Sequence, residues 1–250
     1  MINIAFVGNP NVGKTALINK ISNASLKMGN WPGVTIEKKE VFFKVGNEAV
    51  KLIDLPGIYN LSIGTPEERI SRNFILEEDV DVIINVVDST SLERNLYLTA
   101  LLKEMGKPMV MALNFEDEFK KLDYKLNLET LEKQLGMKTI FTSGRNGAGI
   151  DELMKEAVEA FKRNQTQKQI SYKLSFDNDI EKEIDSVKEK LSKLENKEIL
   201  KKYSLDWLAI KSLENDMNLF ANLKTKYGVD ISDLAKEERE NLKKRYGIDS

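Results

Sequence analysis

The chain has 250 residues, of which 41% are hydrophobic and 31% charged, which suits one large domain or two small ones with a well-solvated surface. The net charge of −2 gives no overall basic character, so we expect no nucleic acid partner. The absence of cysteine and histidine excludes disulfides, thiolate metal sites, cysteine nucleophiles and imidazole acid–base chemistry. No stretch approaches the roughly 18 apolar residues of a membrane span, and no secretory signal is visible, so we predict a cytoplasmic location.

The first chemical motif follows a short apolar strand and precedes a helical segment. It reads Gly8-Asn9-Pro10-Asn11-Val12-Gly13-Lys14-Thr15 and fits the template G-x-x-x-x-G-K-[ST]. In this motif, backbone N–H groups and a helix N-terminus surround a phosphate. Lys14 adds positive charge for the β- and γ-phosphates, and the Thr15 hydroxyl is a Mg²⁺ ligand. A chance match is the alternative, but strand, loop and helix in the required order favour a nucleotide phosphate site.

Strand and helix signals alternate through residue 165, which predicts an α/β sheet with helices on both faces. Two strands joined by Gly46-Asn47 indicate a hairpin, so we expect a mostly parallel six-stranded sheet with one antiparallel edge strand. The predicted strands are 2–7, 38–45, 48–54, 81–88, 108–114 and 138–142. The predicted helices are 14–22, 66–78, 91–105, 127–135 and 150–163.

Between the first helix and the hairpin, two glycines and a proline predict a mobile loop at 25–40. Thr35 in this loop is the residue that we expect to ligate Mg²⁺ when a triphosphate is bound. Trp31 is either an ordinary half-buried aromatic residue or an exposed lid. The loop residues assigned to the nucleotide site are Gly33, Val34, Thr35, Ile36 and Glu37.

The hairpin ends in Asp54-Leu55-Pro56-Gly57. A carboxylate at a strand end holds Mg²⁺ through water, and the Gly57 N–H is placed to sense a γ-phosphate. A plain Asp-x-Pro-Gly turn is the alternative. The position of this segment some forty residues after the phosphate loop favours the functional interpretation, and we expect the loop at 57–70 to reorder with the nucleotide.

Two later strand ends carry the signals for a guanine base. Strand 108–114 ends in Asn114-Phe115-Glu116-Asp117, where the Asp117 carboxylate could accept two N–H bonds from guanine and Asn114 could tie this loop to the phosphate loop. Strand 138–142 ends in Thr142-Ser143-Gly144, whose backbone could meet the guanine carbonyl oxygen. Each signal alone is weak, but their order along the chain is that of a guanine nucleotide site.

Residues 166–250 contain only two glycines and no proline, which predicts a helical second domain after a G domain at 1–165. An apolar stripe at Ile180, Ile184, Val187, Leu191 and Leu194 follows helical spacing. The stripe fits a small helical bundle packed on itself or a dimerising coiled coil. We favour the bundle because the stripe lasts barely two heptads.

These motifs together resemble the FeoB family of ferrous iron transporters. The resemblance rests on GNPNVGKT, NWPGVT, DLPG, Asn-x-x-Asp and the segment DSTSLERNLYL, and it covers residues 1–165; residues 166–250 are similar only in kind to the helical spacer domain of that family. It implies a Ras-like P-loop GTPase fold, GTP/GDP and Mg²⁺ as cofactors, and a role in Fe²⁺ uptake. It also implies a transmembrane iron-permease domain of the same full-length protein as partner and a place at the cytosolic face of the membrane.

Two departures from the common GTPase pattern affect the expected mechanism. Phe115 stands where many relatives have lysine, and could still cover the guanine face by stacking. Ile58 stands where many place a water-orienting glutamine, so catalysis must rest on backbone groups and cations. In potassium-stimulated relatives, the position of Asn11 ligates K⁺, although Asn11 could simply cap a turn. The expected catalytic residues are Lys14, Thr35, Gly57 and Asn11; the Mg²⁺ ligands are Thr15, Thr35 and Asp54.

We therefore expect a slow GTPase in which water attacks the γ-phosphate and the nucleotide state is passed to a membrane domain. A ribosome-assembly GTPase shares the same motifs but normally has an RNA-binding surface. A nucleotide-gated binding switch with incidental hydrolysis is the other alternative. It stays open because Ile58 replaces the glutamine that would orient the attacking water. The sequence also leaves the formation of homo-oligomers open.

Overall fold

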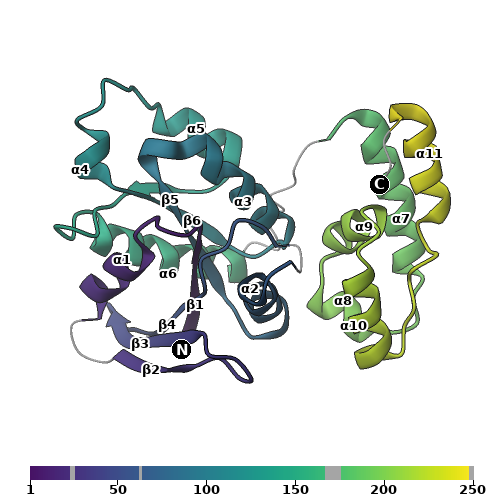
Figure 1. Ribbon diagram of the computed structural model, residues 1–250, viewed down its shortest axis with the longest axis horizontal. Coiled ribbons are helices and arrows are strands. Elements are labelled where there is room, and N and C mark those ends of the chain that lie inside the picture. The colour runs from purple at the N-terminus through teal and green to yellow at the C-terminus, as the bar shows by residue number, and fades with distance from the viewer. Residues whose placement is uncertain (23–25, 62–63, 167–175, 248–250) are drawn as a thin grey trace. The chain divides into compact units, whose positions relative to one another are not determined.

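The structure, a computed structural model, describes residues 1–22, 26–61, 64–166 and 176–247. These residues form two compact units, the first made of residues up to 166 apart from 104–106, and the second of 104–106 and 176–247 (Figure 1). The first unit is a sheet covered by helices on both faces, and the second is helical. Among the described residues, none of the helices is long and apolar enough to cross a membrane.

The sheet has β1 (Ile2–Gly8) at its centre, in the order β2-β3-β4-β1-β5-β6-β7. The strands β4 (Glu48–Asp54), β5 (Val82–Asp88), β6 (Met109–Asn114) and β7 (Thr139–Phe141) all run parallel to β1. Their carboxyl ends therefore lie along one edge, where ligands bind in sheets of this type. Register pairs at this edge, such as Phe6 with Asp54 and Asp88 with Asn114, bring the predicted site segments together.

The sheet has seven described strands, one more than predicted. The additional strand, β2 (Leu26–Asn30), pairs antiparallel with β3 (Glu37–Val45), which in turn pairs antiparallel with β4 across the predicted Gly46-Asn47 turn. The single strand that opposes the others is therefore β3, and β2 forms the edge outside it. The sequence of β2, Leu-Lys-Met-Gly-Asn, has only two alternating apolar residues before a glycine, a pattern too short to distinguish it from a loop.

Alternate residues of the central strands face opposite helix layers. Phe6 and Ile84 belong to the core cluster under α1 (Lys14–Ile21) and α6 (Ile150–Thr166). On the other face, Asn85 of β5 hydrogen-bonds Thr99 of α3 (Leu92–Glu104). The helix α2 (Pro66–Glu77) covers the same face nearer to β1 and β4, so both faces of the sheet are buried. The remaining elements of this unit are η1 (Ser89–Ser91), α4 (Glu116–Phe119) and α5 (Leu128–Leu135).

Local sequence signals determine where α2 begins. The Thr65 hydroxyl accepts a hydrogen bond from the Glu68 N–H, and the Glu68 carboxylate accepts one from the Thr65 N–H, which together form a capping box. Pro66 occupies the first turn, where its missing N–H costs nothing. The start of α2 is therefore fixed directly after the loop that follows Gly57.

The second unit contains α7 (Asn178–Ser192), α8 (Lys197–Lys202), α9 (Leu205–Leu213), α10 (Met217–Tyr227) and α11 (Lys236–Tyr246). Ile184, Val187 and Leu191 of the predicted stripe are buried, and α7 packs against α9 and α11. The stripe is thus covered by the chain itself, as expected for a bundle. The predicted boundary at 165/166 stays a prediction, because α6 runs to Thr166 and residues 167–175 lie outside the described part.

Candidate functional site

The phosphate loop of residues 8–15 lies between β1 and α1, at the carboxyl edge of the sheet. Gly13 is the N-cap of α1 and has φ +82°, a conformation that favours glycine. A Cβ on Gly13 would overlap the Asn114 side chain, and a Cβ on Gly8 would overlap the Val86 carbonyl. Both motif glycines are therefore required by the close approach of neighbouring strands.

The other loop residues differ in their exposure. Asn9 and Val12 are buried, and the Asn9 side-chain oxygen has no hydrogen-bond partner among the described residues. Asn11 and Thr15 are exposed, and Asn11 has φ +67°, a conformation that asparagine tolerates. Two predicted ligand side chains thus reach solvent at this end of the sheet.

Lys14 and Asp54 form an ion pair between the phosphate loop and the end of β4. The Lys14 Nζ lies 3.2 Å from Asp54 Oδ1, and both side chains are nearly buried. Burial raises the pKa of Asp54, although the nearby Lys14 charge opposes this shift. The carboxylate therefore depends on neighbouring positive charge to remain ionised, as a cation-binding carboxylate does.

The segment after Asp54 runs directly past the phosphate loop. The Leu55 N–H donates to the Phe6 carbonyl at 3.1 Å, and the Ile58 N–H donates to the Gly8 carbonyl at 3.2 Å. A Cβ on Gly57 would lie 3.0 Å from Pro10 Cα, so only glycine fits there without adjustment. Ile58 itself is buried at 2% exposure, which points its side chain into the core.

The predicted loop at 25–40 is a β-hairpin whose tip carries Thr35. The Trp31 N–H donates to the Ile36 carbonyl at 2.9 Å, and the Val34 N–H donates to the Trp31 carbonyl at 3.2 Å. Thr35 is exposed, Gly33 has φ +76°, and residues 23–25 lie outside the described part. Glu37, also assigned to the site, pairs with Lys39 at 3.1 Å.

Trp31 is only 6% exposed, so the exposed-lid interpretation is wrong. Its indole packs edge-to-face on Phe74 of α2, with ring centroids 5.2 Å apart. The burial depends on a residue 43 positions away, which local sequence could not reveal.

Asn114 joins the phosphate loop to both predicted base-reading segments. Its Nδ2 donates to the Val12 carbonyl at 2.8 Å, and its Oδ1 accepts from the Gly144 N–H at 3.1 Å. The Thr142 hydroxyl lies 3.4 Å from the same oxygen. The Ser89 hydroxyl donates to the Asn114 carbonyl at 2.6 Å. One buried side chain therefore holds three loops in a fixed relation.

Asp117 is oriented by residues of the neighbouring loop. The Ser143 hydroxyl donates to Asp117 Oδ1 at 2.9 Å, and this hydrogen bond lowers the pKa of Asp117. Arg145 lies 3.7 Å from Oδ2. Phe115 has φ +67°, and its ring would contact a Cβ on Gly13 at 3.2 Å, so the ring lies against the phosphate loop.

The structure thus brings the phosphate loop, the Asp54 segment and the base-reading segments to one edge of the sheet. Sequence reasoning did not single out Ser89, Arg145 or Arg94, whose guanidinium lies 5.6 Å from the Tyr59 ring in the loop after Gly57. The only local signal for Ser89 was its position directly after the end of β5 at Asp88. For the two arginines the sequence offered no signal, because their partners are set by the fold.

This fold and the arrangement of these loops define a P-loop GTP-binding domain with Ras-like architecture, followed by a helical unit. Residues 2–157 match the family model of ferrous iron transport protein B, and residues 176–250 match that of the FeoB cytosolic helical domain. The chain therefore belongs to the FeoB family.

Individual relatives agree with this assignment. The chain is 41% identical over 226 residues to a Fe(2+) transport protein A/FeoB fusion protein of Porphyromonas gingivalis, a match that covers 88% of this chain and 26% of the relative. It is 38% identical over 220 residues to the Fe(2+) transporter FeoB of Escherichia coli K12, covering 86% of this chain and 27% of the relative. The chain thus spans about a quarter of the length of these relatives.

Solved structures extend the similarity to both units. A GDP-bound mutant of S. thermophilus NFeoB has a TM-score of 0.83 and 33% identity, covering 100% of this chain and 92% of that one. The cytosolic domain of the T. maritima FeoB iron transporter in its GMPPNP form has a TM-score of 0.81 and 32% identity, covering 98% of each chain.

Proposed function

We propose that the first unit binds GTP and GDP and hydrolyses GTP slowly, by attack of water on the γ-phosphate without a covalent intermediate. The observation that supports this best is the Asn114 side chain, which links the phosphate loop to the two loops proposed to read guanine. Asp117 would accept two N–H bonds from the base, a pattern that adenine does not offer. Phe115, Thr142, Ser143 and Gly144 would complete the base site.

The phosphates would be held by the backbone of residues 8–15 and by Lys14. Lys14 would move its charge from Asp54 to the phosphates, and the Gly57 N–H would contact the γ-phosphate. Because Ile58 is buried, no side chain at that position is available to orient the attacking water. Backbone donors and cations would therefore stabilise the transition state.

The oxygen atoms around Lys14 suit a hard divalent cation. Thr15, Asp54 and, with a triphosphate bound, Thr35 would hold Mg²⁺, which neutralises phosphate charge. The buried Asp54 carboxylate, with its raised pKa, gains most from such a cation. The family resemblance supports Asn11 as the ligand of a K⁺ ion beside the phosphates, and its exposed left-handed position leaves the side chain free to turn there.

At the level of the full-length protein, we propose that the nucleotide state regulates Fe²⁺ uptake through a transmembrane iron-permease domain of the same chain. This places residues 1–250 at the cytosolic face of the membrane, with a G domain at 1–165 and a helical spacer at 166–250. The names of the relatives support iron transport, and their greater length leaves room for the membrane domain. The family match leaves the ribosome-assembly alternative without support.

Two measurements on the purified chain test the proposal. Titration with fluorescent GDP and ADP should show binding of the guanine nucleotide alone, and phosphate release from GTP should exceed the spontaneous rate. Equal affinity for the two nucleotides would refute the base assignment. Guanine binding without phosphate release would favour the nucleotide-gated switch, which the buried Ile58 also supports.

A further inference from the structure

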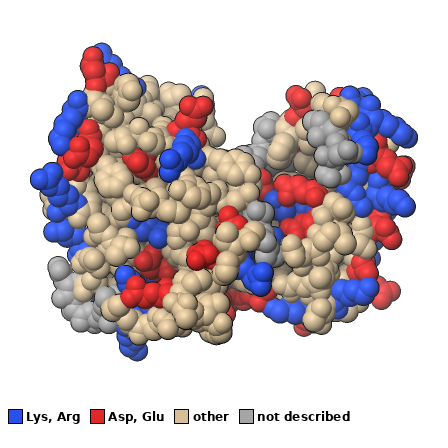
Figure 2. Space-filling view, in the orientation of Figure 1, with Lys and Arg blue, Asp and Glu red and all other residues tan. Residues whose placement is uncertain are grey.

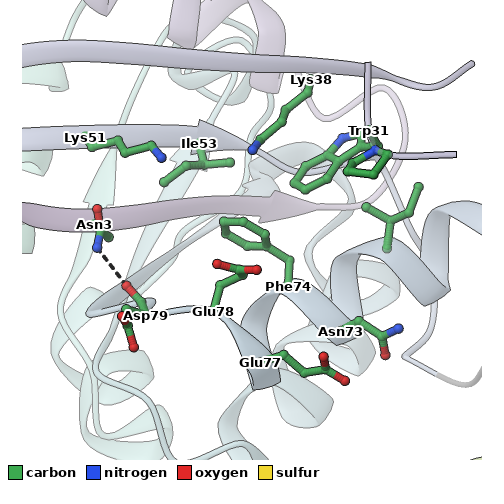
Figure 3. Close-up of a pocket in the computed structure, with 12 residues that line it drawn as sticks. Asn3, Trp31, Lys38, Lys51, Ile53, Asn73, Phe74, Glu77, Glu78 and Asp79 are labelled. Carbon is green, nitrogen blue, oxygen red and sulfur yellow. Dashed lines mark hydrogen bonds between the residues drawn. The ribbon is translucent and has the colours of Figure 1, made fainter. Parts of the chain in front are cut away.

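A cavity of about 400 Å³ opens between the sheet and α2, at a place that the nucleotide site does not use (Figure 3). None of its lining residues belongs to the phosphate loop, the Asp54–Gly57 segment or the base-reading loops. Its volume lies within the roughly 300–1,000 Å³ of small-molecule sites. The lining residues used below are Trp31, Lys38, Ile53, Phe74, Glu78 and Asp79.

One wall of the cavity is aromatic and already binds an ammonium group. Trp31 meets Phe74 edge-to-face, with an interplanar angle of 76°. The Lys38 Nζ lies 4.8 Å from the Trp31 ring centroid and 5.8 Å from that of Phe74, which is the geometry of a cation–π contact. The Trp31 Nε1 is a buried donor without a hydrogen-bond partner among the described residues. Because Lys38 already occupies the cation–π position on Trp31 and Phe74, the wall suits the aromatic ring of a ligand rather than a second ammonium group.

The charges around the cavity favour a cation over an anion. Lys38 and Lys51 point from the strands, but both ammonium groups lie on Glu40, at 3.0 and 2.9 Å from Oε1. Partial burial raises the pKa of Glu40, yet the hydrogen bonds from Lys51 and Lys38 outweigh it and lower the pKa overall, so Glu40 is ionised and balances one lysine. Opposite them, Glu78 and Asp79 are exposed at the end of α2 and follow Glu77 directly, so that, with Glu40, four carboxylates face two ammonium groups around the cavity.

We propose that this cavity is a binding site for a small aromatic cation, meaning an aromatic ring that carries an aliphatic ammonium group. The ring would lie between Phe74 and Ile53, and the ammonium group would face Glu78 and Asp79. An aromatic anion would have to compete with Glu40 for the two lysines and would meet the acidic mouth. An aliphatic cation would have no ring to place between Phe74 and Ile53. The proposed cavity site shares no residue with the proposed nucleotide site, although Trp31 belongs to the same 25–40 segment as Thr35.

A pair of probes with the same ring and opposite charge tests this directly. The full chain is titrated with 2-phenylethylammonium and, separately, with 3-phenylpropanoate, while the indole N–H resonances of the two tryptophans are followed by NMR. The cation should shift the Trp31 resonance saturably and leave Trp207, which lies in the helical unit, unchanged as an internal reference. Stronger binding of the anion, equal responses to both probes, or no saturable shift of Trp31 would overturn the proposal.

Substitutions at the mouth identify the charged partners. The exposed pair Glu78→Gln and Asp79→Asn together should weaken binding of 2-phenylethylammonium by about fivefold, as expected for the loss of two solvent-exposed ion pairs. Glu93→Gln, an exposed acidic residue of α3, is the matched control and should leave the affinity unchanged. Phe74→Leu should weaken binding even with both carboxylates present. Unchanged affinity in the double variant and in Phe74→Leu would show that the probe binds elsewhere.

Discussion

Asn114 is the residue on which the geometry of the candidate site depends most. Both ends of its side-chain amide are used, one by the Val12 carbonyl and one by the Gly144 N–H, and Ser89 holds its backbone carbonyl. A buried polar group that loses its hydrogen-bond partner costs roughly 1–3 kcal/mol of stability. Displacing any one of these loops would leave such a group unpaired, so the loops hold one another in place. A disturbance at the base-reading loops would therefore reach the phosphate loop through one side chain.

Asp117 provides the test of base identity. In Asp117→Asn, the amide presents a donor where guanine also has a donor, whereas xanthine has a carbonyl there, so GTP affinity should fall and xanthosine triphosphate affinity should rise. Hydrogen bonds to charged groups contribute roughly 1.5–3 kcal/mol each, and loss of two should cost about a hundredfold or more in affinity. Titration with fluorescent GTP, ATP and xanthosine triphosphate analogues measures this. A mutant with an unchanged preference would refute the role of Asp117.

Asn11 provides the test of potassium. We expect faster GTP hydrolysis in KCl than in NaCl at equal ionic strength, and loss of the difference in Asn11→Ala. Because Asn11 has φ +67°, alanine also introduces backbone strain, so Asn11→Gly is the matched control that removes the side chain without strain. Both variants should lose the potassium effect. A potassium response that survives in Asn11→Gly would assign the effect to the backbone, and equal rates in the two salts for the unmutated chain would contradict potassium assistance.

At the residue scale, the sequence predicted contacts that a motif brings with it and missed those that the fold creates. Asn114 contacts the phosphate loop, as its motif position indicates, whereas the ion pair between Lys14 and Asp54 was not predicted. Trp31, by contrast, is buried because Phe74 of α2 lies over it. No pattern within a few residues of Trp31 contains that information.

Among the elements, the loop that leads from β7 into α6 offers a matched pair of glycines. Gly147 has φ +86° with no atom near a Cβ, whereas Gly149 has φ +72° and a Cβ there would overlap the Phe141 carbonyl. Gly147→Ala should cost about 1–2 kcal/mol of unfolding free energy, the strain of the left-handed conformation alone. Gly149→Ala should cost at least about 1–3 kcal/mol more, because the backbone overlap adds to the strain. Urea denaturation of both variants measures the difference; equal losses would show that the loop relaxes freely.

The elements that the sequence predicted well are those with a strong local pattern. Strand β6 is apolar up to Asn114, β5 is apolar up to Asp88 except at Asn85, and α2 has its capping box. The strand β2 was missed because Lys27, Met28, Gly29 and Asn30 are all exposed and so carry no buried face. Its conformation comes from backbone pairing with β3, which is a tertiary interaction.

At the scale of the whole molecule, the first unit contains every residue of the candidate nucleotide site. We therefore expect a fragment ending at Thr166 to fold alone and to bind GDP within about threefold of the full chain, a difference of about 0.7 kcal/mol or less in binding free energy. The crystallised G domain of T. maritima FeoB, which matches 64% of this chain at a TM-score of 0.60, is similar to this fragment. Titration of the fragment and of the full chain with GDP tests this, and a large loss of affinity in the fragment would place part of the site beyond residue 166.

Charged side chains of both signs are interspersed over the face shown in Figure 2. A surface with both signs of charge favours solubility, and it lacks the single-sign field that would bind a polyanion. We therefore expect separate molecules to remain apart in solution unless a specific surface makes two of them associate.

The outer edge of β2 is such a surface. In the described part of the chain, no strand pairs with the side of β2 that faces away from β3, so its N–H and C=O groups form an open template for a strand of another molecule. Lys27, whose ammonium lies 4.9 Å from the Phe42 ring, places a charge on this edge, and Gly29 weakens its strand propensity. Replacing both residues by valine should make the chain aggregate at concentrations where the unmutated chain remains monodisperse in light scattering. Two ordinary surface residues would then decide whether the sheet ends within one molecule or continues into the next.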